Sequence, residues 1–202
     1  MIEDWHCLRD GLRSRVVFQQ AQLSAVAVLC LLIVPGVAGQ QSKPSEYQVK
    51  ASYLYNFSRF VEWPQQQGPI QSDHFLICIL GDNPFGSTLN DMVANENIEG
   101  KSVATKQVST SEDAAKCRVV FISFSEEGRL KKILADLHNS SVLTVSDLPR
   151  FIEKGGMIQF VVEDNHVRFQ VNAATAKRAG LSMSSELLKL AVGVQQSAIY
   201  GN

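Results

Sequence analysis

Apolar residues recur at helical spacing between residues 46 and 63, which predicts one largely buried helix. Ser45 is placed to cap this helix, and Pro64 is expected to end it, because proline disfavours helical geometry in the residue before it. Continuous apolar runs at residues 75–80 and 119–124 predict strands that are covered on both faces. Weaker apolar patterns predict two further strands, at residues 103–108 and at residues 141–145.

The segments between these strands predict short helices. Asn83 and Pro84 suit the first positions of a helix that runs to about residue 94. An amphipathic helix is expected to open at Ser125, because apolar side chains then recur on one face. The remaining short helical or turn segments are expected at residues 111–116 and 148–154.

The pattern changes in the C-terminal part. Two apolar runs, residues 157–162 and 167–171, flank a polar turn at Asp164-Asn165, which predicts an antiparallel hairpin. Helices are then expected over residues 173–179 and 184–192, with a loose tail from Gln195. The whole order predicts an α/β fold: a three-layer sandwich with a mostly parallel sheet and an antiparallel C-terminal hairpin, flanked by helices.

The first 39 residues predict a secretory signal peptide. Three arginines precede an apolar run at residues 23–34, and small residues lead to a cleavage site after Gly39. An uncleaved anchor would need roughly 20 apolar residues, and a lipoprotein would need a small residue before Cys30, where Leu29 stands. We therefore predict a periplasmic protein, without stable membrane insertion, whose single domain spans residues 40–202 with its core at about 46–192.

The net charge limits the kinds of partner that are expected, and the cysteine content bears on whether the protein contains a disulfide. The formal net charge is −1 and no basic run longer than two residues occurs, so nucleic acid is not an expected partner. Removal of the leader would leave two cysteines, Cys78 and Cys117. In an oxidising compartment such a pair is a disulfide candidate, and the alternative is two unpaired cysteines buried as small hydrophobic residues.

A search for reactive groups finds no catalytic constellation, metal site or cofactor motif in the sequence. The turn that follows residue 80 lacks the glycine spacing of a dinucleotide loop. Cys78 lies within an apolar strand, where burial suppresses the thiolate. Ser123 and Ser125 are not part of a nucleophile elbow, and the histidines lie far apart in sequence.

Three stretches together resemble the YfiR family of periplasmic proteins. The first is an aromatic helix that ends on Trp63-Pro64, the second is the strand and turn at residues 77–86, and the third runs from residue 167 to residue 191. In order and spacing they cover nearly the whole mature chain, from about Tyr47 to Val192.

The resemblance implies a regulator without catalytic activity. Family members are expected to dock on the periplasmic sensor domain of an inner-membrane diguanylate cyclase and to repress it, which lowers cyclic-di-GMP signalling and biofilm output. An outer-membrane lipoprotein that sequesters the repressor, and a homodimer, are further expected partners. The resemblance also implies a disulfide between Cys78 and Cys117, whereas a second, C-terminal disulfide of the family has no cysteines here.

Two sets of side chains are candidates for binding. The aromatic helix is expected to be mainly core, but Trp63 is a candidate for an exposed partner anchor. The alternative function is a small-ligand receptor that signals to a membrane partner from the carboxyl edge of the sheet. Arg168, Lys177 and Arg178 are the cations that could hold an anionic solute in that case.

Overall fold

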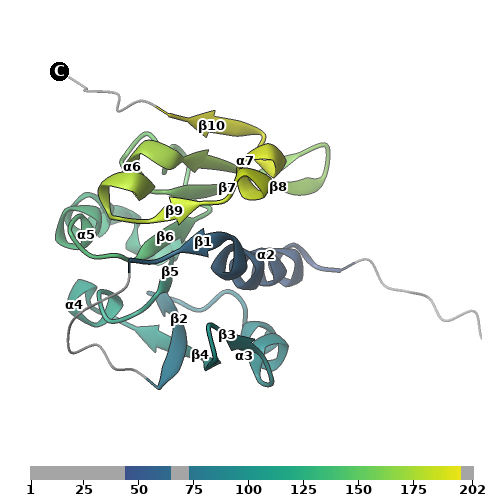
Figure 1. Ribbon diagram of the computed structural model, residues 1–202. Helices are drawn as coiled ribbons and strands as arrows, with labels where there is room; N and C mark the ends of the chain where they lie inside the picture. Colours follow the sequence, from purple (N-terminus) through teal and green to yellow (C-terminus); the bar gives the residue numbers. More distant parts are fainter. Residues whose placement is uncertain (1–43, 65–72, 197–202) are drawn as a thin grey trace, which may run out of the picture. The chain divides into compact units, whose positions relative to one another are not determined.

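The computed structural model describes residues 44–64 and 73–196, and the predicted signal peptide and its cleavage site lie outside these residues (Figure 1). The described residues form a mixed α/β domain around an eight-stranded sheet with the order β10-β8-β7-β6-β5-β2-β4-β3. Five neighbouring strands, β4, β2, β5, β6 and β7, run parallel to one another, and β8 is antiparallel to β7. The predicted fold class is therefore confirmed.

The strands have the following bounds: β2 (His74–Leu80), β3 (Asn97–Ile98), β4 (Lys101–Val108), β5 (Val119–Ile122), β6 (Leu143–Ser146), β7 (Ile158–Glu163), β8 (His166–Asn172) and β10 (Gly193–Gln195). Two further strands, β1 (Val61–Glu62) and β9 (Ser182–Met183), pair with each other outside the large sheet. The helices are α2 (Glu46–Phe60), α3 (Thr88–Val93), α4 (Ser111–Ala114), the 3₁₀ helix η1 (Phe124–Arg129), α5 (Leu130–Leu137), α6 (Ala173–Arg178) and α7 (Ser185–Leu190).

Each face of the sheet has its own hydrophobic core. The first core lies between the sheet and helices α2, α3, α6 and α7, and the second core lies between the sheet and helices α4 and α5. Strand β2 serves both cores, because its side chains alternate: Ile77 and Ile79 enter the first core, and Cys78 and Leu80 enter the second. This arrangement explains why residues 75–80 are continuously apolar.

Local signals in the sequence account for several element boundaries. The Ser45 hydroxyl accepts a hydrogen bond from the backbone of Gln48, whose side chain accepts one from the backbone of Ser45, so α2 begins with a capping box. In the β7–β8 hairpin, Asp164 and Asn165 both have positive φ angles, 49° and 59°, as a tight two-residue turn requires. The Asn172 side chain caps α6 by accepting a hydrogen bond from the backbone of Thr175.

Four sequence-based boundaries are wrong. Helix α2 ends at Phe60, because Val61 and Glu62 are extended and pair with β9. Helix α3 begins only at Thr88, because the Asn83 side chain accepts from the backbone of Phe85 and donates to that of Gly86, which closes a separate turn. Residues 148–154 form turns instead of the predicted short helix. Gln195, where a loose tail was expected to begin, is the last residue of strand β10, which spans residues 193–195.

Candidate functional site

A disulfide bond between Cys78 and Cys117 ties the centre of β2 to the loop that follows α4. The two sulfur atoms are 2.01 Å apart and the Cα atoms 6.1 Å apart, which is ordinary disulfide geometry. Both residues are buried in the second core, with exposed fractions of 0% and 4%. The bond that the family resemblance implied is thus present in the structure.

Trp63 lies in the first core and is not an exposed anchor. Its side chain is only 7% exposed, and its ring meets that of Phe75 edge to face at a centroid distance of 5.3 Å. Its indole nitrogen Nε1 is buried and has no hydrogen-bond partner among the residues that the structure describes. The expectation that Trp63 contacts a partner is therefore corrected, because the β1–β9 pairing beside it holds this part of the chain against the domain.

The three candidate cations do not form one cluster. Phe169 and Val171 of β8 point into the first core, which α6 also covers. Arg168 alternates with Phe169 along the strand, so its side chain leaves the opposite face of the sheet. Lys177 and Arg178 are exposed on α6, and the Arg178 guanidinium donates to the hydroxyl of Thr175. The three cations therefore do not form a common binding site for an anion.

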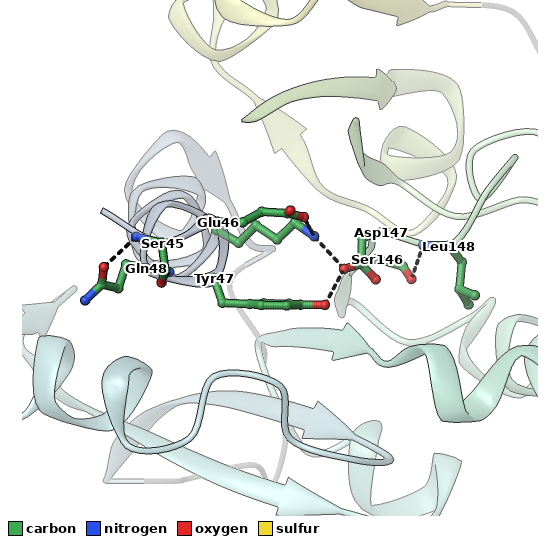
Figure 2. A network of polar contacts seen from close by, with 8 residues as sticks. Ser45, Glu46, Tyr47, Gln48, Ser146, Asp147 and Leu148 are labelled. Atoms are coloured by element: carbon green, nitrogen blue, oxygen red, sulfur yellow. Dashed lines mark hydrogen bonds and ion pairs between the residues drawn. The ribbon is translucent and has the colours of Figure 1, made fainter. Parts of the chain in front are cut away.

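The structure instead brings charged groups together at the start of α2, a site that the sequence analysis missed (Figure 2). The Lys50 ammonium is 3% exposed and lies 2.6 Å from both Glu46 Oε1 and Asp147 Oδ2. The Tyr47 hydroxyl donates a hydrogen bond to the same Asp147 oxygen, and the Lys50 ammonium also lies 4.5 Å from the centre of the Tyr47 ring. Asp147 directly follows β6, so this network fixes α2 on the carboxyl edge of the sheet.

The electrostatics of this network favour a charged lysine. Burial by itself would lower the pKa of Lys50, but its hydrogen bonds to Asp147 and Glu46 outweigh burial and raise that pKa above its ordinary value. Burial, together with the negative charge of Asp147, raises the pKa of Tyr47. The ammonium therefore stays protonated at neutral pH, which suits a structural ion pair and not a nucleophile. One sequence signal could have revealed it, because Lys50 interrupts the apolar stripe between Tyr47 and Leu54.

A second polar region lies at the carboxyl ends of β2 and β4, beside η1, the 3₁₀ helix that follows β5. A cavity of about 520 Å³ is found there, and we call it the carboxyl-edge cavity. Its lining includes these side chains and backbone groups: Gly81, Asp82, Lys106, Gln107, Asp113 and Glu126. A ligand is expected at this edge of the sheet from the order of strands and helices, but the cations predicted to hold it lie on α6 and β8, and the carboxylates of this cavity were not predicted.

The described residues contain no group of three or more histidine, cysteine, aspartate or glutamate side chains that could hold a metal ion. Within the same residues, no helix is both long and apolar enough to cross a membrane. The polar network at α2 is saturated by its own partners, and the cysteines are bonded to each other. What remains for binding is the surface of the domain and its cavities.

Fold and site thus define an α/β domain that is stapled by one disulfide and whose buried charges are paired internally. A family model described as YfiR/HmsC-like matches residues 47–192, nearly the whole of the described domain. The chain belongs to the YfiR/HmsC-like family. This family is regulatory and non-catalytic, implies a periplasmic location, and suggests regulation of diguanylate cyclase signalling in that compartment.

Two solved structures are similar to this chain at low identity. A conserved domain protein from Vibrio cholerae O1 biovar eltor has a TM-score of 0.49 and 10% identity, over 76% of this chain and 61% of that one. An ABC domain in complex with L-Trp from Streptococcus pneumonia has a TM-score of 0.47 and 11% identity, over 73% of this chain and 60% of that one. The chain spans about three fifths of each structure's length, and neither likeness bears on its ligand or activity. A comparison with curated proteins found no match.

Proposed function

We propose that the protein is a periplasmic repressor that docks on the periplasmic sensor domain of an inner-membrane diguanylate cyclase. Docking lowers cyclic-di-GMP synthesis and, with it, biofilm output. The observation that carries this proposal is the family match, which extends from the first turn of α2 to the second residue after α7. In the same proposal the protein acts without catalysis or a cofactor, forms a homodimer, and is sequestered by an outer-membrane lipoprotein.

The surface of the domain offers apolar side chains for such contacts. Among the described residues, Phe124 is 65% exposed and Leu190 is 63% exposed. Large apolar side chains that remain in water are typical anchors of protein interfaces. With Trp63 buried, these two side chains replace it as the candidates for partner contact.

The docking model is tested with purified components. Protein expressed from its full sequence and recovered from the periplasm is mixed with the periplasmic domain of a membrane-anchored diguanylate cyclase from the same organism, and binding is measured by calorimetry. We expect saturable binding, and we expect deletion of the gene to raise cellular cyclic-di-GMP. Absence of binding together with unchanged cyclic-di-GMP would contradict the proposal.

Matched surface variants locate the contact. Phe124→Ser and Leu190→Ser each remove one exposed apolar side chain, the first from η1 and the second from α7, so each serves as the control for the other. If Phe124 contacts the cyclase, its variant binds at least tenfold more weakly while the thermal midpoint is unchanged. Equal affinities of both variants and the unaltered protein would exclude both side chains from the interface.

One observation favours a second candidate function, a small-ligand receptor that signals to a membrane partner. The carboxyl-edge cavity has a volume of about 520 Å³, which falls within the range of small-molecule sites. A thermal-shift screen with small metabolites tests this function, because a ligand of the folded state raises the midpoint by mass action. A flat response across the screen would leave only the docking model.

A further inference from the structure

The carboxyl-edge cavity lies where the connections of the sheet diverge. After β2 the chain passes to α3 in the first core, and after β5 it passes through η1 to α5 in the second core. Strands β2 and β5 are neighbours in the sheet, so their continuations leave on opposite sides. In open parallel sheets, ligands bind outside the carboxyl ends of the strands at such a switch point.

Hydrogen bonds hold one wall of the cavity in place. The Ser125 hydroxyl accepts a hydrogen bond of 2.9 Å from the backbone of Asp82, and the Gln107 amide donates one of 2.8 Å to the carbonyl of Gly81. A side chain at Gly81 would not fit, because its Cβ would lie 2.4 Å from the Ser125 hydroxyl and Gly81 has a φ angle of +92°. The wall is therefore formed before any ligand arrives.

The charge of the lining is carried by Glu126 and Asp82. The Glu126 side chain is 8% exposed, and its Oε2 atom lies 2.5 Å from the Arg129 guanidinium in an ion pair, without a hydrogen bond in the described part of the chain. Its charge partner is Arg129, whose side chain is 58% exposed and also donates to the carbonyl of Ser109. In the ranges 44–64 and 73–196, no hydrogen bond or ion pair reaches the Asp82 carboxylate.

The remaining charges of the cavity are satisfied at its other side. Lys116 donates to Asp113 and lowers the pKa of that carboxyl, and Lys106 contributes to the same effect. The described residues thus leave one nearly buried carboxylate whose charge partner is an exposed guanidinium, together with one unpaired carboxylate. Both attract a cation, and neither suits an anionic solute.

We propose that the carboxyl-edge cavity binds a small organic cation through an ammonium or guanidinium group held by Glu126 and Asp82. Arg129 is the resident counter-cation, and the ligand displaces it from Glu126. The ligand class is opposite in charge to the anionic solute that Arg168, Lys177 and Arg178 suggested. The proposal is independent of cyclase docking, because binding is measured without any partner protein.

Agmatine and putrescine are suitable probes, since both present compact cationic groups. Protein expressed from its full sequence and labelled with ¹⁵N is titrated with each amine, and the backbone amides of Gly81, Asp82 and Ser125 are followed. We expect saturable shifts at these amides that weaken as sodium chloride is raised. Sodium acetate is the control and should leave them in place. The proposal is overturned if neither amine shifts them, or if acetate does.

Three substitutions should change the affinity for the amine in different directions. Asp82→Asn should weaken binding at least fivefold, whereas Glu163→Gln, which neutralises an exposed carboxylate at the β7–β8 hairpin, should leave it unchanged. Arg129→Ala should tighten binding at least threefold, because it removes the competing cation from Glu126. Asp82 is exposed, so its variant is expected to fold normally. Unaltered binding by Asp82→Asn, or weaker binding by Arg129→Ala, would overturn the proposal.

Discussion

The first core of the sheet holds a cluster of aromatic rings, whereas the second core holds the disulfide. In the first core, the ring of Phe57 meets those of Phe160 and Phe169 at centroid distances of 5.8 Å and 4.9 Å, and Tyr53 joins them. In the second core, short helices α4 and α5 cover the sheet, and Phe151 is the one buried aromatic residue among its described members. The smaller core thus relies on a covalent bond where the larger one relies on apolar area.

This contrast follows from the lengths of the covering helices. Helix α2 has 15 residues and buries a broad face, while α4 has only four residues. Four residues cannot bury enough apolar area to hold a loop by packing alone. The Cys78–Cys117 bond closes this part of the chain instead, with a sequence separation of 39 residues. Four perturbations test the comparison.

Removal of a ring from the first core should have the largest effect. Phe57 is 1% exposed, so Phe57→Ala should lower the free energy of unfolding by about 3–5 kcal/mol, through lost burial and the cavity that remains. Phe60→Ala on the same helix is the control, because Phe60 is 36% exposed and should cost less than about 1 kcal/mol. Urea denaturation measures both. Equal losses would contradict the assigned role of the first core.

Removal of the disulfide should have the next largest effect. The double variant Cys78→Ala/Cys117→Ala should lose about 2–4 kcal/mol of unfolding free energy, since the unfolded chain is no longer constrained. Urea denaturation with and without dithiothreitol measures the loss. The unaltered protein should approach the variant under reducing conditions, and the variant should not respond to the reductant. A reductant-independent curve for the unaltered protein would show that the bond contributes nothing.

The Lys50 network should respond differently to two substitutions. Lys50→Met leaves the Asp147 carboxylate without its cation and should cost about 2 kcal/mol, whereas the double variant Lys50→Met/Asp147→Leu replaces both charges with apolar side chains and should cost less than about 1 kcal/mol. The difference between the two variants is measured by thermal and urea unfolding. Equal costs of the single and the double variant would show that the unpaired carboxylate does not decide the outcome.

Alkaline pH should produce the smallest change. The pKa values of Lys50 and Tyr47 are raised in the folded protein, so the folded chain keeps protons that the unfolded chain loses above a pH of about 10. Stability from these groups is therefore complete below that pH and declines as the pH rises further. Urea curves from pH 8 to 11 should show the decline, Lys50→Met should reduce it, and exposed Lys131→Met should not. A steeper decline in Lys50→Met would reverse this assignment.

Much of the fold could be predicted because the signals are local. The apolar runs of β2 and β5, the turn at Asp164-Asn165 and the Asn172 cap each depend on residues within one element or one turn. The failures depend on distant partners. Val61 and Glu62 continue a helical pattern, but they become extended because Ser182 and Met183 offer backbone pairing. No sequence window around residue 61 contains that information.

The candidate site was less predictable for a related reason. Lys50 and Asp147 are 97 positions apart, and only the folded sheet brings them to 2.6 Å. The carboxyl-edge cavity similarly combines the ends of β2 and β4 with residues of α4 and η1. Sequence reasoning could name the edge of the sheet from the order of strands and helices. It could not tell which charges face that edge, because this depends on strand order and on the direction of each connection.

The distant partners of α2 bear on the order in which the chain is made. This helix is synthesised first among the described elements, yet Phe57 packs on Phe160 and Phe169, and the residues that follow it pair with β9. Its apolar face can complete its native contacts only after β7, β8 and β9 have emerged from the ribosome. A nascent chain that lacks these strands leaves the Phe57 ring without Phe160 and Phe169, so the first core cannot close until synthesis of the domain is nearly finished.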